Sequence, residues 1–377
     1  MFSYIKKCKI KDYDFVLIFL LMAITIIGIL SLGSVDQADQ TKQIYGFVAG
    51  MVVMVVISLM DYTFVLKFWY LIYALNIILL ALVNFMGEET FGAQRWITIA
   101  GIRFQPSESA KILLILFFAQ FIMFFRERIN KFYVVVLAVM LIGLPLLLII
   151  KQPDLSTTIV IFLIFLTMLF VGNISYKYVF SFLGISIPSF VIVFAMILNG
   201  HPFIMKFIKE YQRTRILAWL HPEDYATEEA YQQLNSIMAI GSGMLTGKGL
   251  NNNVVNSVKN GNFISQPQTD FIYTIVGEEL GFIGASAVIL LLLCICLRCI
   301  YIAYKAKDIQ GKVIASGMAA LVGFQSLINI SVNVGLLPNT GLPLPFVSYG
   351  LTSLLSLYAG MGFVLNVGLQ RPKKYAN

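Results

Sequence analysis

Long apolar segments alternate with short polar ones along nearly the whole chain. Ten of them are long enough for a helix to cross a bilayer, which takes about 17 to 25 residues. These spans are 14–35, 44–60, 68–86, 108–125, 132–150, 155–172, 178–198, 271–303, 313–335 and 346–368. The pattern predicts an all-α polytopic membrane protein with ten transmembrane helices in a single integral membrane domain, 1–377.

Composition agrees with this pattern and excludes a soluble domain. The 377 residues are 59% hydrophobic and only 12% charged, whereas roughly 25% charged residues are usual in soluble proteins. The formal net charge is +8. Because the basic residues follow the predicted topology and form no patch, we expect no nucleic-acid partner.

The distribution of Lys and Arg between the loops sets the orientation, because cytoplasmic loops carry an excess of them. With the N-terminus inside, sixteen fall on the inner side and five in the short outer loops and their edges. The other six lie in the long loop 199–270 and are excluded from the count, because the rule applies to short loops. The inner ones are Lys6, Lys7, Lys9, Lys11, Lys67, Arg126, Arg128, Lys131, Lys177, Arg298, Lys305, Lys307, Lys312, Arg371, Lys373 and Lys374. The outer ones are Lys42, Arg95, Arg103, Lys111 and Lys151. Both termini are therefore predicted to be cytoplasmic, and 199–270 becomes a large extracellular loop between helices 7 and 8.

This loop is predicted to contain amphipathic helices. The segment "FIMKFIKEYQRTRILAWL" (203–220) alternates apolar and basic positions at helical spacing, which suits a helix lying in the membrane interface. Arg213 and Arg215 lie on it. Their guanidinium groups suit paired hydrogen bonds to phosphate, and the alternative is attraction to anionic lipid headgroups.

Acidic residues lie at the entry of the eighth span, in "SQPQTDFIYTIVGEEL" (265–280). Asp270 opens the span, where burial beside apolar walls would raise its pKa towards that of a general base. The alternative is an N-cap of the helix, and the sequence alone leaves both roles open. Glu278 and Glu279 lie deeper, and we expect them to have a structural hydrogen-bonding role.

Two further charged motifs precede apolar spans. In "QPSESAK", Glu108 and Lys111 are three residues apart on one helix face. They form either an internal ion pair or a cation site for an anionic substrate. In "KQPDL", Asp154 begins a helix, so it is either a cap or a substrate-binding residue.

Two outer segments have distinctive backbone or aromatic character. Trp96 lies in "GAQRW" within the loop 87–107, and "GLLPNTGLPLPFVSYG" (335–350) is rich in proline and contains Ser348, to which we assign a structural role. Non-helical backbone at membrane depth must be buried in protein or line a cavity. The residues therefore predict an outward cavity with carboxylates and cations, suited to a phosphate-bearing amphiphile. No metal-ligand cluster is present, although a divalent cation at the phosphates remains compatible with the sequence.

Five stretches resemble the family of cell shape, elongation, division and sporulation (SEDS) proteins, which includes RodA, FtsW and SpoVE. They are "GAQRWITIAGIRFQPSESAK", "QPDLSTTIV", "AIGSGMLTGKGL", "QPQTDFIYTIVGEELG" and "GLPLPFVSYG". They occur over most of the chain in the order and spacing of the family. Gln268 stands where members often have histidine, and "SYGLTS" replaces the common "SYGGSS". The wording "NTGLPLPFVSYG" favours the elongation (RodA-like) branch.

The resemblance implies a ten-helix peptidoglycan glycosyltransferase that polymerises lipid II on the outer face of the bacterial cytoplasmic membrane. It also implies a class B penicillin-binding protein as partner, within the elongation or division complex. By resemblance, Asp270 is the catalytic carboxylate, and Trp96, Glu108, Lys111 and Asp154 are matching motif residues. A flippase for lipid-linked precursors and a scaffold for the division or elongation complex are the alternatives.

Overall fold

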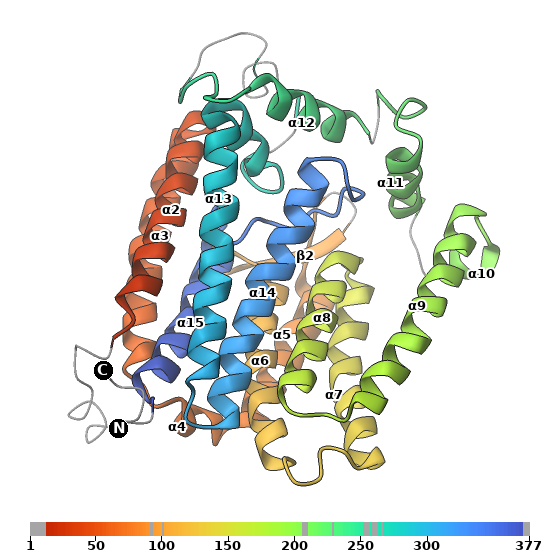
Figure 1. Cartoon of the computed structure of the whole chain (residues 1–377). Coiled ribbons are helices and arrows are strands. Elements are labelled where there is room, and N and C mark those ends of the chain that lie inside the picture. Colours follow the sequence, from red (N-terminus) through yellow and green to blue (C-terminus); the bar gives the residue numbers. More distant parts are fainter. Residues whose placement is uncertain are drawn as a thin grey trace.

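The computed structural model describes residues 13–90, 93–99, 102–205, 210–227, 230–251, 257, 263–264 and 267–371. The helices are α2 (Phe15–Val35), α3 (Gln37–Ser58), α4 (Tyr62–Leu66), α5 (Trp69–Met86), α6 (Pro106–Phe124), α7 (Phe132–Lys151), α8 (Leu155–Val171), α9 (Tyr176–Leu198), α10 (Pro202–Met205), α11 (Glu210–Leu220), α12 (Tyr231–Ser242), α13 (Ile272–Tyr304), α14 (Ile309–Asn333) and α15 (Leu351–Leu369). Figure 1 shows them as a bundle of long, roughly parallel helices, with the short helices α11 and α12 towards one end and α4 at the other.

Nine helices among the described residues are long and apolar enough to cross a membrane. They are α2, α3, α5, α6, α7, α9, α13, α14 and α15. The apolar helix α8 is slightly shorter, with 17 residues. The sequence-based prediction of a polytopic helical membrane protein is confirmed. The lysines at positions 6, 7, 9, 11, 206, 209, 373 and 374 lie outside the described residues.

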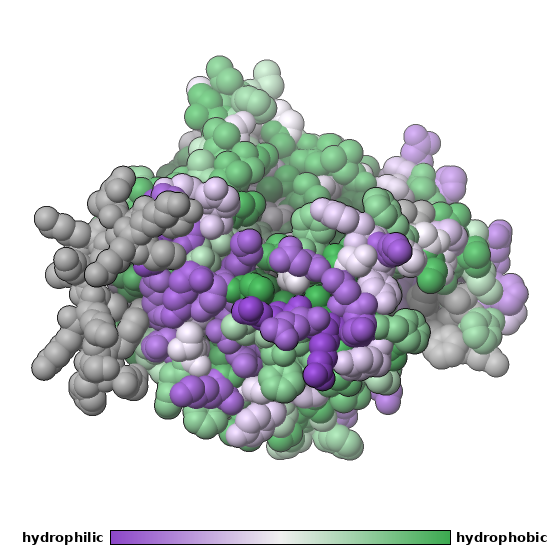
Figure 2. All heavy atoms as spheres, turned by 60° about the horizontal axis from the view of Figure 1, so that its bottom comes forward, coloured by the Kyte–Doolittle hydropathy of each residue, from purple (hydrophilic) through white to green (hydrophobic). Residues whose placement is uncertain are grey.

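The ends of the bundle differ in character. In Figure 1, α2 begins and α15 ends at the bottom, which we call the lower end, whereas α13 begins at the opposite, upper end. Hydrophilic side chains gather on the lower end, with apolar side chains around them (Figure 2). The basic residues of the loops and helix ends there include Lys67, Arg126, Arg128, Lys131, Lys305, Lys307, Lys312 and Arg371.

The centre of the bundle is formed by α6, α14 and α15, which pack against one another. In the most apolar 18-residue stretch of each helix, about 70% of the residues are buried inside the protein: 72% in α6, 67% in α14 and 72% in α15. We call these three helices the inner bundle. In contrast, α9 stands apart from it in Figure 1.

The loop 87–107, which was predicted to lie on the outer side, contains a small sheet that the hydropathy pattern did not predict. Strands β1 (Glu88–Thr90), β2 (Ala93–Ile99) and β3 (Ile102–Phe104) pair antiparallel in the order β1-β2-β3. The strands are three to seven residues long, and such short runs give little periodic signal. The all-α prediction is therefore corrected by one short sheet.

The last helix begins later than predicted. The hydropathy pattern extended the tenth span from residue 346, whereas α15 begins at Leu351. Residues 346–350 form turns instead, and the Ser348 hydroxyl accepts a hydrogen bond from the Leu344 amide at 2.7 Å. Gly350 has a φ of 158°. The prolines of "GLPLPF" keep this apolar segment non-helical, since proline cannot supply the amide that a helix interior needs.

Helix α13 is interrupted near its upper end, where Gly281 has a φ of 63°. Such a break leaves backbone groups without hydrogen-bond partners within the helix. The segment after α12 provides the missing partners. The amides of Lys248 and Gly249 donate to the carbonyls of Glu278 and Glu279, each at 3.0 Å. In return, the amide of Phe282 donates to the Met244 carbonyl at 2.9 Å. The large loop is thereby joined to α13 beside Glu278.

Candidate active site

Asp270 lies immediately before α13, and its main chain is held by α14. The side-chain amides of Asn329 and Asn333 both donate to the Asp270 carbonyl, at 2.8 and 3.0 Å. The Asn329 amide also donates to the Leu342 carbonyl at 2.6 Å. Because both asparagines are buried, they fix the Asp270 backbone against the proline-rich segment.

A second set of hydrogen bonds holds Asn333 itself. Thr274 donates to its side-chain oxygen at 2.8 Å, and Ser236 donates to its main-chain carbonyl at 2.7 Å. The hydroxyl oxygens of Ser236 and Thr274 also lie 2.5 Å from each other. Buried polar groups that are fully connected in this way hold one arrangement firmly. Helices α12, α13 and α14 are thus joined directly behind Asp270.

The Asp270 carboxylate lies in a half-buried, charged environment. The protein packed around it removes water and raises its pKa to about 6, whereas Arg215, Arg95 and a Thr269 hydrogen bond act in the lowering direction. Asp154 opposes the arginines and raises the pKa further. A carboxylate with a pKa near neutrality is suited to accept a proton at physiological pH.

The structure also bears on the alternative role of Asp270 as a helix cap. Phe271 occupies the N-cap position of α13, and this helix has no side-chain cap hydrogen bond. The Asp270 side chain instead lies next to Gly341, where an added Cβ would come within 3.3 Å of its Oδ2 atom. The Asp270 side chain therefore does not cap α13.

Arg95 connects β2 to the turn between α7 and α8. Its guanidinium donates to the Gln152 carbonyl at 3.3 Å and to the Pro153 carbonyl. Its Nη1 atom also lies 4.0 Å from the carboxylate of Asp154. The carbonyl of Pro153 additionally accepts hydrogen bonds from Tyr211 and Gln212 of α11. Three segments far apart in sequence therefore meet at this turn, next to Asp270.

The two arginines predicted on the amphipathic segment have different surroundings. The Arg213 guanidinium donates to the carbonyls of Ile197 and Leu198, at 3.0 and 3.3 Å, and so caps the end of α9. Arg215 acts electrostatically on Asp270 and lies over the Tyr211 ring at 5.5 Å. Residues 206–209 of the predicted helix lie outside the described residues. Only Arg215 of this pair is grouped with the carboxylate.

Asp154 caps α8, the structural alternative that the sequence left open. Its carboxylate accepts hydrogen bonds from the Thr157 amide at 3.2 Å and from the Thr157 hydroxyl at 2.9 Å. Its negative charge also acts on Asp270. A role for Asp154 in substrate binding stays a prediction.

Glu108 and Lys111 form a buried ion pair inside the inner bundle. The Lys111 ammonium lies 2.7 Å from Glu108 and also donates to Gln325 at 2.7 Å. Ser353 of α15 donates to the other Glu108 oxygen at 2.7 Å. The side-chain amide of Gln325 in turn donates a hydrogen bond to the Pro343 carbonyl at 2.9 Å. Both charged side chains are at most 2% exposed, so the pair is internal, which is the structural alternative that the sequence left open. Contact of Lys111 or Glu108 with a substrate stays a prediction.

The remaining predicted residues lie around this centre. Glu278 forms an ion pair with Lys248 at 2.7 Å, and Glu279 is buried beside it. The Ser348 carbonyl accepts a hydrogen bond from Gln43 at 3.0 Å. Trp96 is half-buried on β2, where it pairs with Glu88. Its functional role stays a prediction.

Sequence reasoning did not single out Arg95, Asn329 or Asn333. Asn329 and Asn333 are four residues apart in "INISVN" of an apolar span, and this spacing puts both on one helix face. Polar side chains at helical spacing in a membrane span are a usable signal. Arg95 carried no such signal, because its position depends on the sheet. Within the described ranges, no three His, Cys, Asp or Glu side chains are grouped to hold a metal ion.

Comparison with known proteins gives matches over nearly the whole chain. The family profile of FtsW, RodA and SpoVE, described as cell cycle proteins, matches residues 11–373. A probable peptidoglycan glycosyltransferase FtsW of Geobacter sulfurreducens is 31% identical, with 95% of this chain and 96% of the relative covered. The peptidoglycan glycosyltransferase MrdB of Escherichia coli is 33% identical, with 95% and 94% covered.

Solved structures have the same fold. A chain reported under "Structural coordination of polymerization and crosslinking by a peptidoglycan synthase complex" superposes with a TM-score of 0.77 at 27% identity, covering 94% of this chain and 97% of that one. The rod shape determining protein RodA of Thermus thermophilus superposes with a TM-score of 0.67 at 24% identity, covering 95% and 97%. The residues around Asp270, the helical fold and the family match agree, and this chain belongs to the FtsW, RodA and SpoVE family of cell cycle proteins.

Proposed function

We propose that this protein is a peptidoglycan glycosyltransferase that polymerises lipid II into glycan strands at the outer face of the bacterial cytoplasmic membrane. The relatives named as peptidoglycan glycosyltransferases support this reaction. The observation that carries it is the half-buried Asp270 with two arginines, Arg95 and Arg215, acting on its charge. This combination supplies one base and two cations in one place.

The proposed topology has ten spans, with α8 as the sixth, and cytoplasmic termini. The basic residues of the lower end support this orientation, since cytoplasmic loops are rich in Lys and Arg. A helix of 17 residues is at the lower limit of about 17 for crossing the hydrocarbon core. Asp270 then lies at the outer face, and the loop between α9 and α13 is extracellular.

In the proposed reaction, Asp270 removes the proton from the 4-hydroxyl of the acceptor sugar. The hydroxyl oxygen attacks the anomeric carbon of the donor sugar, the bond to the diphosphate breaks, and the lipid diphosphate leaves with inversion. A diphosphate leaving group requires neutralisation of its charge more than protonation. Arg215 and Arg95 are the cations proposed for this task, and a divalent cation at the diphosphate is compatible with it.

The proposed partner is a class B penicillin-binding protein, which crosslinks the strands. The match to a chain from a complex that coordinates polymerization and crosslinking supports this pairing. The polymerase reaction is proposed to belong to this chain, and the partner is proposed only to increase its rate. Polymerisation is therefore measured both with and without the partner.

The test is polymerisation of purified lipid II by the full chain, alone and with its class B partner. Asp270→Asn preserves size but cannot accept the proton, so we expect at least a hundredfold loss of rate, as about 10² to 10⁴ is typical for a general base. Asp224→Asn, an exposed site in the same large loop, is the control for the charge change. Polymer from a folded Asp270→Asn at the wild-type rate would refute the base. No polymer from wild type with its partner would favour a flippase or scaffold.

A further inference from the structure

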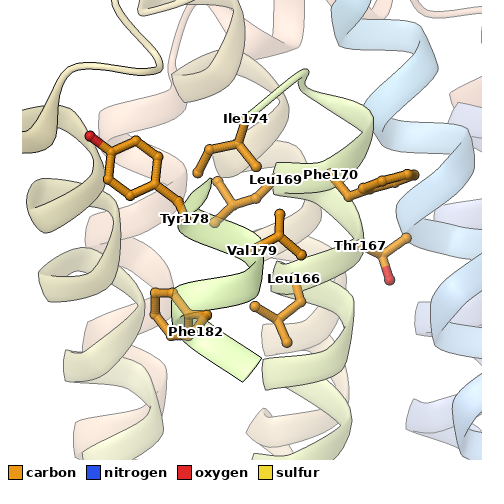
Figure 3. A pocket seen from close by; sticks show the side chains of 8 residues that line it. All are labelled: Leu166, Thr167, Leu169, Phe170, Ile174, Tyr178, Val179 and Phe182. Atoms are coloured by element: carbon orange, nitrogen blue, oxygen red, sulfur yellow. The ribbon is translucent and has the colours of Figure 1, made fainter. Parts of the chain in front are cut away.

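A groove at the lower end of the protein combines an apolar slot with a cationic mouth. The slot, about 250 Å³, lies between α8 and α9 and is lined mainly by Leu166, Leu169, Phe170, Val179 and Phe182. Figure 3 shows Leu166, Leu169 and Val179 close together where the two helices meet, with Phe170 and Phe182 extending to opposite sides. Thr167 and Tyr178 contribute the few polar atoms of the lining.

A larger hollow continues from the slot towards the lower end. It has a volume of about 770 Å³, and it shares Phe170 and Ile174 with the slot. Its lining changes from apolar to polar, and includes Asn130, Ser175, Lys177 and Lys312. The two lysines come from different elements, since Lys177 lies in the first turn of α9 and Lys312 in the first turn of α14.

The described lining carries positive charge without a carboxylate. Lys177 and Lys312 are its charged residues, and the other polar members are Asn130, Asn173, Ser175 and Ser316 with two tyrosines. The start of α9 also borders the hollow, and Ser175 at its N-cap makes no side-chain cap hydrogen bond. Helix N-termini carry a partial positive charge, which adds to that of the lysines. The electrostatics therefore favour an anionic group in the hollow.

From this geometry we propose that the groove binds one anionic phospholipid, with its phosphate at Lys177 and Lys312 and an acyl chain in the slot between α8 and α9. Basic pockets between transmembrane helices at a membrane surface are suited to anionic headgroups. An acyl chain gains little by leaving other acyl chains, because lipid tails are as apolar as leucine. The slot therefore provides shape, and the lysines provide the preference for a negative headgroup.

The weak packing of α9 agrees with this occupant. Only 6% of the residues in its most apolar 18-residue stretch are buried inside the protein, so most of its surface is available to lipid. The groove lies at the opposite end of the bundle from Asp270, because it is formed by the α8–α9 turn, the end of α13 and the start of α14. The proposed site is thus separate from the one assigned to lipid II.

The test is native mass spectrometry of the full chain in detergent, titrated with phosphatidylglycerol and, in parallel, with phosphatidylcholine. We expect the first phosphatidylglycerol to bind more tightly than phosphatidylcholine. The double variant K177Q/K312Q should lose about 25-fold in affinity for phosphatidylglycerol, at roughly fivefold for each lysine. The control double variant K67Q/R128Q removes the same charge from the lower end, outside the groove, and should bind as wild type does.

A third variant tests the slot separately from the charge. V179W fills the space between α8 and α9 and leaves both lysines in place, so we expect it to reduce the binding of the first phosphatidylglycerol. Equal affinity of wild type for the two lipids would overturn the proposal, as would equal losses in K177Q/K312Q and the control pair. Unchanged binding by V179W would also overturn it, because the tail would then lie elsewhere. The retained thermal transition of each variant verifies folding.

Discussion

The inner bundle and α9 are both apolar, yet they differ in what surrounds them. Helix α6 has a mean hydropathy of 1.6 and is 72% buried within the protein, whereas α9 has a mean hydropathy of 2.3 and is 6% buried. The more apolar helix is thus the less buried one. In a membrane protein the lipid accepts apolar surface as readily as the protein does, so hydropathy alone does not identify the core.

Buried polar residues distinguish the two regions better. The inner bundle contains Glu108, Lys111, Asn329 and Asn333, all buried and hydrogen-bonded. In α9 the charged residue is Lys177, at the first turn. Polar groups at membrane depth are costly unless they are paired. Their presence therefore indicates where the protein packs against itself, and the comparison can be tested by paired substitutions.

The largest effect is expected for Lys111→Met. Removing the ammonium leaves the Glu108 charge buried without its partner, which typically costs about 3–5 kcal/mol. The measurement is the free energy of unfolding in detergent. Phe190→Ala on the lipid-facing side of α9, where the side chain is 65% exposed, should cost less than about 0.5 kcal/mol.

The double variant Glu108→Gln/Lys111→Met separates structure from substrate binding. It removes both charges, so much of the lost stability should return, because neutralised buried pairs are often nearly neutral in stability. Polymerisation of lipid II by this variant then reports on the predicted contact of Lys111 with substrate. A single variant as stable as wild type would contradict the buried ion pair.

The second effect is a loss of rate in Asn329→Asp. The new oxygen would face the carbonyls of Asp270 and Leu342, which Asn329 now joins, and Asp270 would move. A displacement of about 1 Å can reduce a rate by roughly a hundredfold. Steady-state kinetics should show the loss mainly in kcat. Asn199→Asp, at the exposed end of α9, is the matched control, and equal kcat values in the two variants would exclude the positioning role.

The third effect is a loss of stability in Gly281→Ala. Gly281 has a φ of 63°, and an added Cβ would come within 2.3 Å of the Gly247 amide nitrogen. Strain of this kind costs on the order of 1–3 kcal/mol. Gly184 of α9 has no heavy atom within 4 Å of such a Cβ, so Gly184→Ala should be neutral or stabilising by up to about 1 kcal/mol. Thermal unfolding of both variants in one detergent makes the comparison, and similar shifts would contradict it.

Much of the fold was predictable from sequence, because hydropathy reports helix length directly. The predicted span 68–86 compares with α5 at Trp69–Met86, and 132–150 compares with α7 at Phe132–Lys151. The start of α15 was predicted five residues too early, since apolar residues between prolines look like helix in a hydropathy pattern. The sheet of 88–104 depends on pairing between short strands, which no local pattern encodes.

The candidate site was predictable only in part. Asp270 is identified by its acidic character at a span entry and by its motif. Arg95 reaches the same place only because β2 and the α7–α8 turn meet, a contact between segments about 57 residues apart. The burial of Lys111 against Glu108 follows from packing with α14 and α15, which spacing along one helix does not reveal.

The central claim is that Asp270 acts as the base, and its most direct test is the pH dependence of lipid II polymerisation. The carboxylate must be ionised to accept a proton, and its pKa is raised to about 6. The rate should therefore fall as the pH decreases through 6. Arg215 lowers this pKa, so Arg215→Gln should move the acid limb to higher pH. A rate independent of pH between about 5 and 7 in wild type, with an unchanged profile in Arg215→Gln, would contradict the account.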